Sequence, residues 1–117
     1  MTAAYIIVAA LLTLACLLTG GAKLAGTADM RRRAAHLGVP WWGYVVIGCL
    51  EVLAAAGLVV GIWWPPLGAA AAGGLVLLMI GAIAMHARAG EPRKTMLPAL
   101  VVGILAATAL TIALLRG

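Results

Sequence analysis

Four apolar runs, each close to 20 residues long, constrain this chain more than any other feature of its sequence. They cover roughly residues 3–24, 42–63, 67–87 and 96–115. An α-helix needs about 20 apolar residues to cross the ~30 Å of hydrocarbon in a bilayer, so each run predicts one membrane-spanning helix. Because 66% of the residues are hydrophobic and 9% are charged, a soluble domain of this size is excluded. We expect a single transmembrane domain, residues 1–117.

The connections between the runs are short, which predicts an all-α, integral membrane, up-and-down four-helix bundle. Pro65 and Pro66 end the second run and leave room for only a tight turn, while Gly90 and Pro92 interrupt the third connection. The first run lacks a basic leader and is too long for a cleavable signal peptide. It is therefore expected to remain as a membrane span.

The first connection is predicted to hold a short amphipathic helix between the first two spans. Thr27 is placed to cap it, and Met30, Ala34 and Leu37 recur at helical spacing opposite the arginines at 31–33. Such a helix is expected to lie on the membrane surface with its arginines toward anionic headgroups. A simple basic anchor explains these arginines better than specific lipid recognition does.

Basic residues gather in two of the three connections. They are Lys23, Arg31, Arg32 and Arg33 around the first, and Arg88, Arg93 and Lys94 around the third. The positive-inside rule makes these connections cytoplasmic and places both termini outside, for a multi-pass protein of the cell (cytoplasmic) membrane. The formal net charge of +5 is divided between two separate loops, so the lipid bilayer is the expected partner and nucleic acid is not.

Glu51 is the acidic residue that falls inside an apolar run. A charge within a bilayer costs at least ~2.5–3.5 kcal/mol on insertion scales, and such groups usually face a partner inside the bundle. Glu51 follows Tyr44 by seven residues, which places it about 10 Å into the membrane at 1.5 Å per residue. At that depth a glutamate is too short to reach the headgroups, so a site around Glu51 is expected.

The first run offers a partner for this carboxylate. It presents a polar stripe at helical spacing, which consists of Cys16, Thr19 and Lys23 with Gly20 beside it. The face of the second run that carries Glu51 also carries the small residue Gly48, which leaves room for a lysine to reach across. We predict a Lys23–Glu51 ion pair, because a lysine partner favours the ionised carboxylate.

His86 lies near the inner end of the third run and Arg88 follows it in the third connection, and one or the other is predicted to lie close enough to join the pair. The candidate acid/base residues are thus Glu51, Lys23 and His86, and the candidate ligand pocket adds Cys16, Thr19, Gly20, Gly48 and Arg88. Three alternatives stay open: Lys23 reaches the headgroups alone, His86 is an ordinary interfacial histidine, or the ion pair is structural.

The remaining sequence signals for cofactors and partners are weak. Cys16 and Cys49 are isolated and are interpreted as small apolar residues rather than metal ligands, and His36 with His86 makes only a poor case for haem. Gly57 and Gly61 form a GxxxG pair, which favours close helix packing either within the chain or in a homo-oligomer.

Several segments together resemble the DoxX-like family of small bacterial membrane proteins. They are GGAKL (20–24), LGVP (37–40), IGCLEVLAAAGLVVGIWWPPLG (47–68), LLMIGAIAMH (77–86) and LPAL (97–100). The resemblance implies a four-helix bundle whose typical polar positions fall on Lys23, Glu51 and His86. Relatives in that family include a membrane subunit of a thiosulfate:quinone oxidoreductase, members of thiol-redox complexes and a vertebrate receptor-assembly chaperone. This chain has no paired redox cysteines.

These observations favour a protein that binds the polar head of a lipophilic, quinone-like molecule or serves as the membrane component of a redox system. One alternative is an intramembrane isomerase, cyclase or hydrolase with Glu51 as acid or base. Another is a scaffold or assembly factor that binds partner helices through its small residues. A small proton-coupled exporter fits less well, because small multidrug exporters carry their glutamate in the first helix and lack this charge bias.

Overall fold

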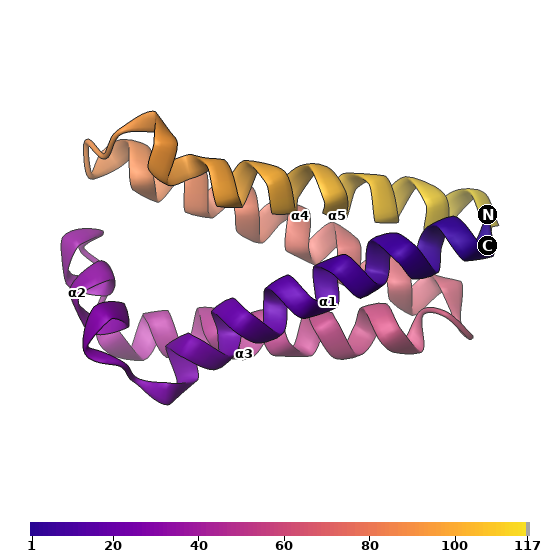
Figure 1. The fold of residues 1–117 in the computed structure, drawn as a ribbon, viewed down its shortest axis with the longest axis horizontal. Helices are drawn as coiled ribbons and strands as arrows, with labels where there is room; N and C mark the ends of the chain where they lie inside the picture. The colour runs from indigo at the N-terminus through magenta and orange to yellow at the C-terminus, as the bar shows by residue number, and fades with distance from the viewer. Residues whose placement is uncertain (117) are drawn as a thin grey trace.

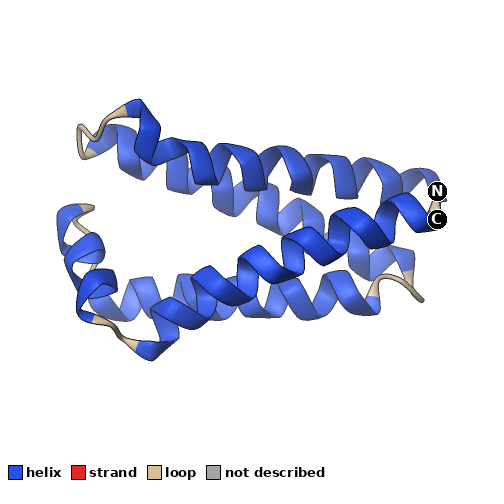
Figure 2. Cartoon of the chain, viewed as in Figure 1, coloured by secondary structure: helices blue, strands red, loops and turns tan. Residues whose placement is uncertain are grey.

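The fold is entirely helical over residues 1–116, which are the residues that the computed structural model describes (Figures 1 and 2). The helices are α1 (Thr2–Ala25), α2 (Ala28–His36), α3 (Trp41–Val60), α4 (Pro65–Arg88), the 3₁₀ turn η1 (Arg93–Met96) and α5 (Leu97–Arg116). Four helical stretches, with η1 and α5 joined as one, are long and apolar enough to cross a membrane. The predicted all-α membrane bundle is confirmed.

The helix boundaries differ from the predicted ones mainly around the second connection. α3 ends at Val60 rather than at residue 63, because Gly61–Trp63 form the turn. α4 begins at Pro65 rather than at residue 67, since prolines are tolerated in the first turn of a helix, where their missing N–H groups need no partner. The fourth span begins earlier than predicted, as the 3₁₀ turn η1 precedes α5.

The short helix α2 forms where the sequence predicts it. The Thr27 hydroxyl accepts a hydrogen bond from the Met30 backbone N–H at 3.2 Å and caps the first turn. Asp29 in that turn pairs with Arg33 at 3.0 Å, one turn further along the same exposed surface. The amphipathic helix between the first two spans is therefore confirmed.

The spans form two closely packed pairs, α1 with α3 and α4 with α5. Figure 1 shows that the pairs converge at the end that carries both chain termini and spread apart toward the end that carries α2 and η1. We name these the terminal end and the basic end. The fully buried large side chains are Tyr5, Leu12, Leu58 and Leu75. They belong to one apolar core that α1, α3, α4 and α5 share.

Small residues and one tyrosine close the terminal end. The buried Tyr5 hydroxyl donates a hydrogen bond to the Leu58 carbonyl at 2.8 Å. A Cβ on Gly61 would collide with the Gly68 Cα, and a Cβ on Gly68 would collide with the Tyr5 hydroxyl, so α3 and α4 approach here backbone to backbone.

One turn away, a Cβ on Gly57 would lie 2.8 Å from the Ala71 Cβ. Both glycines of the predicted GxxxG pair, Gly57 and Gly61, are therefore used for packing within the chain. A homo-oligomer through them stays a prediction.

Candidate functional site

The Glu51 carboxylate and the Lys23 ammonium form an ion pair between α3 and α1. Glu51 Oε1 lies 3.0 Å from Lys23 Nζ, and the two side chains are 4% and 12% exposed, respectively. Glu51 belongs to the middle of α3, whereas Lys23 belongs to the last turn of α1, where the helix dipole also favours a cation. The pair is thus almost fully withdrawn from the surface of the bundle, and Lys23 is its more accessible member.

Two further polar side chains contact this pair. The Thr19 hydroxyl lies 2.5 Å from Glu51 Oε2 and 2.9 Å from the Ala15 carbonyl, so its single hydrogen has two competing acceptors. Lys23 Nζ lies 5.2 Å from the centre of the Tyr44 ring, within range of a cation–π interaction. The sequence pointed to Thr19, but the role of Tyr44 as more than an interfacial aromatic residue was missed.

Glycines bring α1 and α3 together beside the ion pair. A Cβ on Gly20 would lie 2.9 Å from the Gly48 carbonyl oxygen, and a Cβ on Gly48 would lie 2.9 Å from the Lys23 Cβ. Cys16 is buried one turn from Thr19. The structure thus places these three predicted pocket residues next to the pair, and the two glycines act there by letting the helices touch.

His86 lies in a second polar cluster at the basic end. Its Nδ1 atom is paired with Glu91 Oε1, and Glu91 Oε2 lies 3.1 Å from His36 Nε2. Lys23 and Glu51 therefore stand together as predicted, while the partner of His86 is a carboxylate that the sequence reasoning did not select. We call His36, Glu91 and His86 the His–Glu–His cluster.

The backbone at the end of α4 explains why Glu91 contacts His86. Gly90 adopts a left-handed conformation with φ of 71°. The Glu91 N–H then bonds to the His86 carbonyl at 3.2 Å, and the Gly90 N–H bonds to the Ala87 carbonyl at 3.1 Å. These two bonds define a Schellman cap, which turns the chain back onto the helix it has just left. In the sequence, the signal for this contact was a glycine after the third apolar run, followed directly by an acidic residue.

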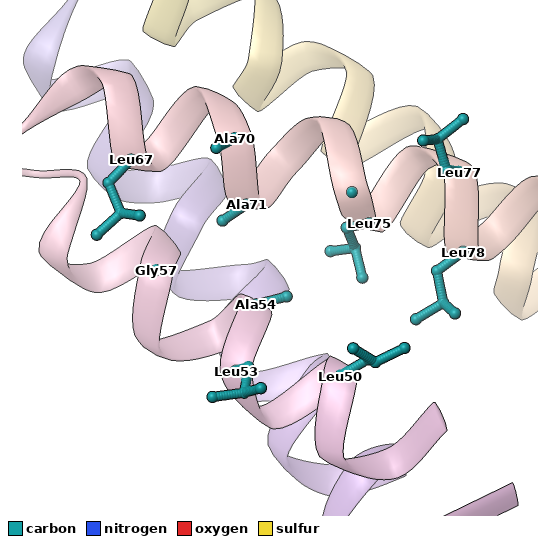
Figure 3. A pocket seen from close by; sticks show the side chains of 11 residues that line it. Leu50, Leu53, Ala54, Gly57, Leu67, Ala70, Ala71, Leu75, Leu77 and Leu78 are labelled. Carbon is teal, nitrogen blue, oxygen red and sulfur yellow. The ribbon is translucent and has the colours of Figure 1, made fainter. Parts of the chain in front are cut away.

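Two cavities lie close to these clusters, on different sides of the bundle. The first is an apolar groove of about 580 Å³ between α3 and α4, and Figure 3 shows Leu50 and Leu78 opposite each other across it. Leu50 and Ala54, which border this groove, lie one residue before and three residues after Glu51.

The second cavity, of about 410 Å³, lies between the α2–α3 connection and the end of α4. It is bordered by His36 and by the exposed residue Arg88. The structure therefore places Arg88 beside the His–Glu–His cluster, and not in a polar contact with Glu51 or Lys23.

The side chains around Glu51 can form hydrogen bonds with a polar group of a ligand inside the apolar part of the membrane. The lysine offers hydrogen-bond donors, the carboxylate offers acceptors, and the threonine hydroxyl offers either. Among the described residues no group of three His, Cys, Asp or Glu side chains is placed to hold a metal ion, and Cys16 and Cys49 are both free. The polar groups present at this site are the ion pair, the Thr19 hydroxyl and the nearby Cys16 thiol.

Fold and site together define the class of this protein: a small multi-pass membrane protein with a buried ion pair between two of its spans. A family model described as the DoxX-like family matches residues 7–109, which is most of the chain. The chain therefore belongs to the DoxX-like family. No curated protein and no solved structure gives a significant match.

Proposed function

We propose that the Lys23–Glu51 pair binds the polar head of a lipophilic, quinone-like molecule, and that the protein serves as a membrane component of a redox system. The observation that carries this proposal is the burial of the pair, with Glu51 only 4% exposed. Desolvation of two charges is expensive, and replacement of a buried pair by apolar residues is often neutral or stabilising. A pair retained at such cost favours a role beyond structure.

The chemistry of the pair matches such a head group. A quinone offers carbonyl oxygens, which accept hydrogen bonds from an ammonium, and the reduced form offers hydroxyl groups, which donate to a carboxylate. Lys23 is the more exposed member, so it is the natural first contact for an incoming carbonyl. Thr19 then supplies a hydroxyl that exchanges between Glu51 and the Ala15 carbonyl.

The apolar groove between α3 and α4 provides a place for the tail of such a molecule. Its lining is formed by leucine, alanine and glycine residues (Figure 3). Leu50 and Ala54 connect the groove to the segment of α3 that carries Glu51. Binding sites of this kind combine an apolar volume with a few placed polar groups.

The basic residues favour an orientation with the basic end in the cytoplasm and both termini outside, in the cell membrane. An acid/base enzyme is the second candidate class, with Glu51 as the acid or base. The pairing of His86 with Glu91 favours ligand binding over this alternative, because the imidazole is engaged in the other cluster.

The proposal is tested with a benzoquinone that carries one isoprenoid unit, titrated into the purified protein in nanodiscs. Binding is followed by quenching of tryptophan fluorescence, since Trp41 lies beside Tyr44 with 6.0 Å between the ring centres. We expect saturable quenching that is lost in Glu51→Gln and in Lys23→Gln. The matched control is Asp29→Asn, which removes an exposed carboxylate from α2. Equal binding by the Glu51→Gln variant and the parent protein would refute the site.

A further inference from the structure

We infer that the His–Glu–His cluster is a proton-responsive latch, which joins the two helix pairs at the basic end and sets the width of the α3–α4 groove. The Glu91 carboxylate contacts His36 of α2 through one oxygen and His86 of α4 through the other. It therefore joins the half that contains α1, α2 and α3 to the half that contains α4 and α5. The role of the latch in ligand entry rests on the proposed function above, whereas the latch itself does not.

The position of the latch follows from the shape of the bundle. The helix pairs converge at the terminal end and spread toward the basic end, where the latch lies (Figure 1). At the narrow part of the groove, Gly57 packs on Ala71. Leu50 and Leu78 border it further toward the basic end (Figure 3). A link beyond this wide part controls how far α3 and α4 separate.

Both histidines are fixed by the same backbone device. His36 is the last residue of α2, and Gly38 with φ of 74° reverses the chain after it. The Val39 N–H bonds to the Ala34 carbonyl at 2.9 Å, as in the Schellman cap that follows His86. Each imidazole thus lies in the last turn of a capped helix.

The response to pH follows from the chemistry of the three groups. Histidine changes charge between about pH 5 and 8, whereas a glutamate is ordinarily ionised throughout that range. When both imidazoles are protonated, two cations face the Glu91 carboxylate and the latch is strongest. When they are neutral, each imidazole keeps a single N–H donor and the ionic attraction is lost, so the latch loosens.

Other ionisable groups lie on the elements packed around the latch. They are Asp29 and Arg33 on α2, Tyr44 on α3, Arg88 on α4, and Arg93 and Lys94 on η1. Asp29 is already paired with Arg32 and Arg33, which leaves Glu91 as the carboxylate that faces the histidines. The carboxylate of Glu91 is therefore the group that joins the two imidazoles.

The latch lies at the same end of the bundle as the proposed ligand site. There the Tyr44 ring lies within cation–π range of the Lys23 ammonium. A loosened latch frees α4 to move away from α3 and opens the groove that we propose for the ligand tail. The inferred regulation is therefore slower entry of a lipophilic ligand at acidic pH and faster entry at alkaline pH.

The test measures the separation of the two halves by pulsed electron paramagnetic resonance in nanodiscs. Spin labels are attached at Ala28→Cys on α2 and Ala84→Cys on α4, both exposed positions, after replacement of Cys16 and Cys49 by alanine. We expect longer distances at pH 8 than at pH 6. A second label pair at the terminal end, Ala3→Cys with Ala70→Cys, should show no change, because glycine backbones hold that end.

Two matched carboxylate variants decide whether the latch causes the change. Glu91→Gln should give the long distances at both pH values, whereas Asp29→Asn at the same end should behave like the parent. Distances that do not respond to pH, or an Asp29→Asn variant that matches Glu91→Gln, would overturn the latch. If the distances change with pH but benzoquinone binding does not depend on Glu51, the proposed function fails. The role of the latch in ligand entry then fails with it. The pH-dependent distances would still support the latch itself.

Discussion

At the terminal end the two helix pairs meet through glycine backbones and a tyrosine, whereas at the basic end they are joined through charged side chains. Gly61 and Gly68 allow α3 and α4 to touch, and the Tyr5 hydroxyl, which donates to the Leu58 carbonyl within the α1–α3 pair, lies against Gly68 of α4. At the other end, Glu91 bridges His36 and His86. The glycine contacts at the terminal end depend on shape and are insensitive to pH. The contacts between charged side chains at the basic end change with protonation.

This difference suggests a division of labour within one small bundle. The terminal end acts as a fixed joint, and the basic end is the part of the molecule whose opening can be regulated. The Lys23–Glu51 pair belongs to neither joint, because it lies within the α1–α3 pair. Of the three changes below, ordered from the largest expected effect to the smallest, the first tests the ion pair and the other two test the fixed joint.

Removal of one member of the buried ion pair is expected to be the most destabilising change. Lys23→Met leaves Glu51 buried without its cation, and the loss of one partner from a buried pair typically costs about 3–5 kcal/mol. The double variant Lys23→Met/Glu51→Leu should recover much of this loss, since no charge then remains unpaired. Reversible unfolding in bicelles measures the free energy of unfolding of the single and the double variant. Arg32→Gln, at a side chain that is 77% exposed, is the control and should change stability by less than about 1 kcal/mol.

An added methyl group at the fixed joint is expected to have the next largest effect. A Cβ on Gly61 meets the Gly68 backbone, and forced overpacking typically costs about 1–3 kcal/mol. Gly74→Ala on α4 is the matched control, because a Cβ there has no neighbour within 4 Å and alanine favours the helix. Thermal unfolding should show a lower midpoint for Gly61→Ala and an unchanged or higher one for Gly74→Ala. Equal midpoints would contradict the backbone contact.

The smallest of the three effects is expected for Tyr5→Phe. This change removes the buried hydroxyl that donates to the Leu58 carbonyl at 2.8 Å and keeps the ring, so the expected loss is about 1 kcal/mol. The same unfolding measurement applies. The distance between labels at the basic end should not change in Tyr5→Phe, and a change there would show that the two joints are not independent.

The sequence was sufficient to predict four apolar helices, the amphipathic helix capped by Thr27, and the Lys23–Glu51 contact. Each depends on a local signal: the length of an apolar run, a cap residue, or the helical spacing that puts Thr19 and Lys23 on one side of α1. Each of these signals can be recognised within a stretch of about 20 residues, because the geometry of a single helix determines which of its residues share a face.

The arrangement of the basic end could not be predicted in the same way. The divergence of the helix pairs depends on which small residues meet across α3 and α4, and helical spacing does not determine that. The contact between Glu91 and His86 requires the left-handed Gly90 to reverse the chain. The sequence reasoning treated Gly90 only as a helix breaker, so it overlooked the residue that the turn directs back onto the helix.

The most direct test of the ligand site is solid-state nuclear magnetic resonance of the ion pair in lipid bilayers. Selective labelling reports the coupling between the Lys23 Nζ nitrogen and the Glu51 carboxyl carbon, which are close in the unliganded protein. We predict that addition of the single-isoprenoid benzoquinone shifts both resonances and weakens their coupling, while the Asp29 carboxyl signal stays fixed. Unchanged Lys23 and Glu51 signals, at a quinone concentration that saturates tryptophan quenching, would contradict the account.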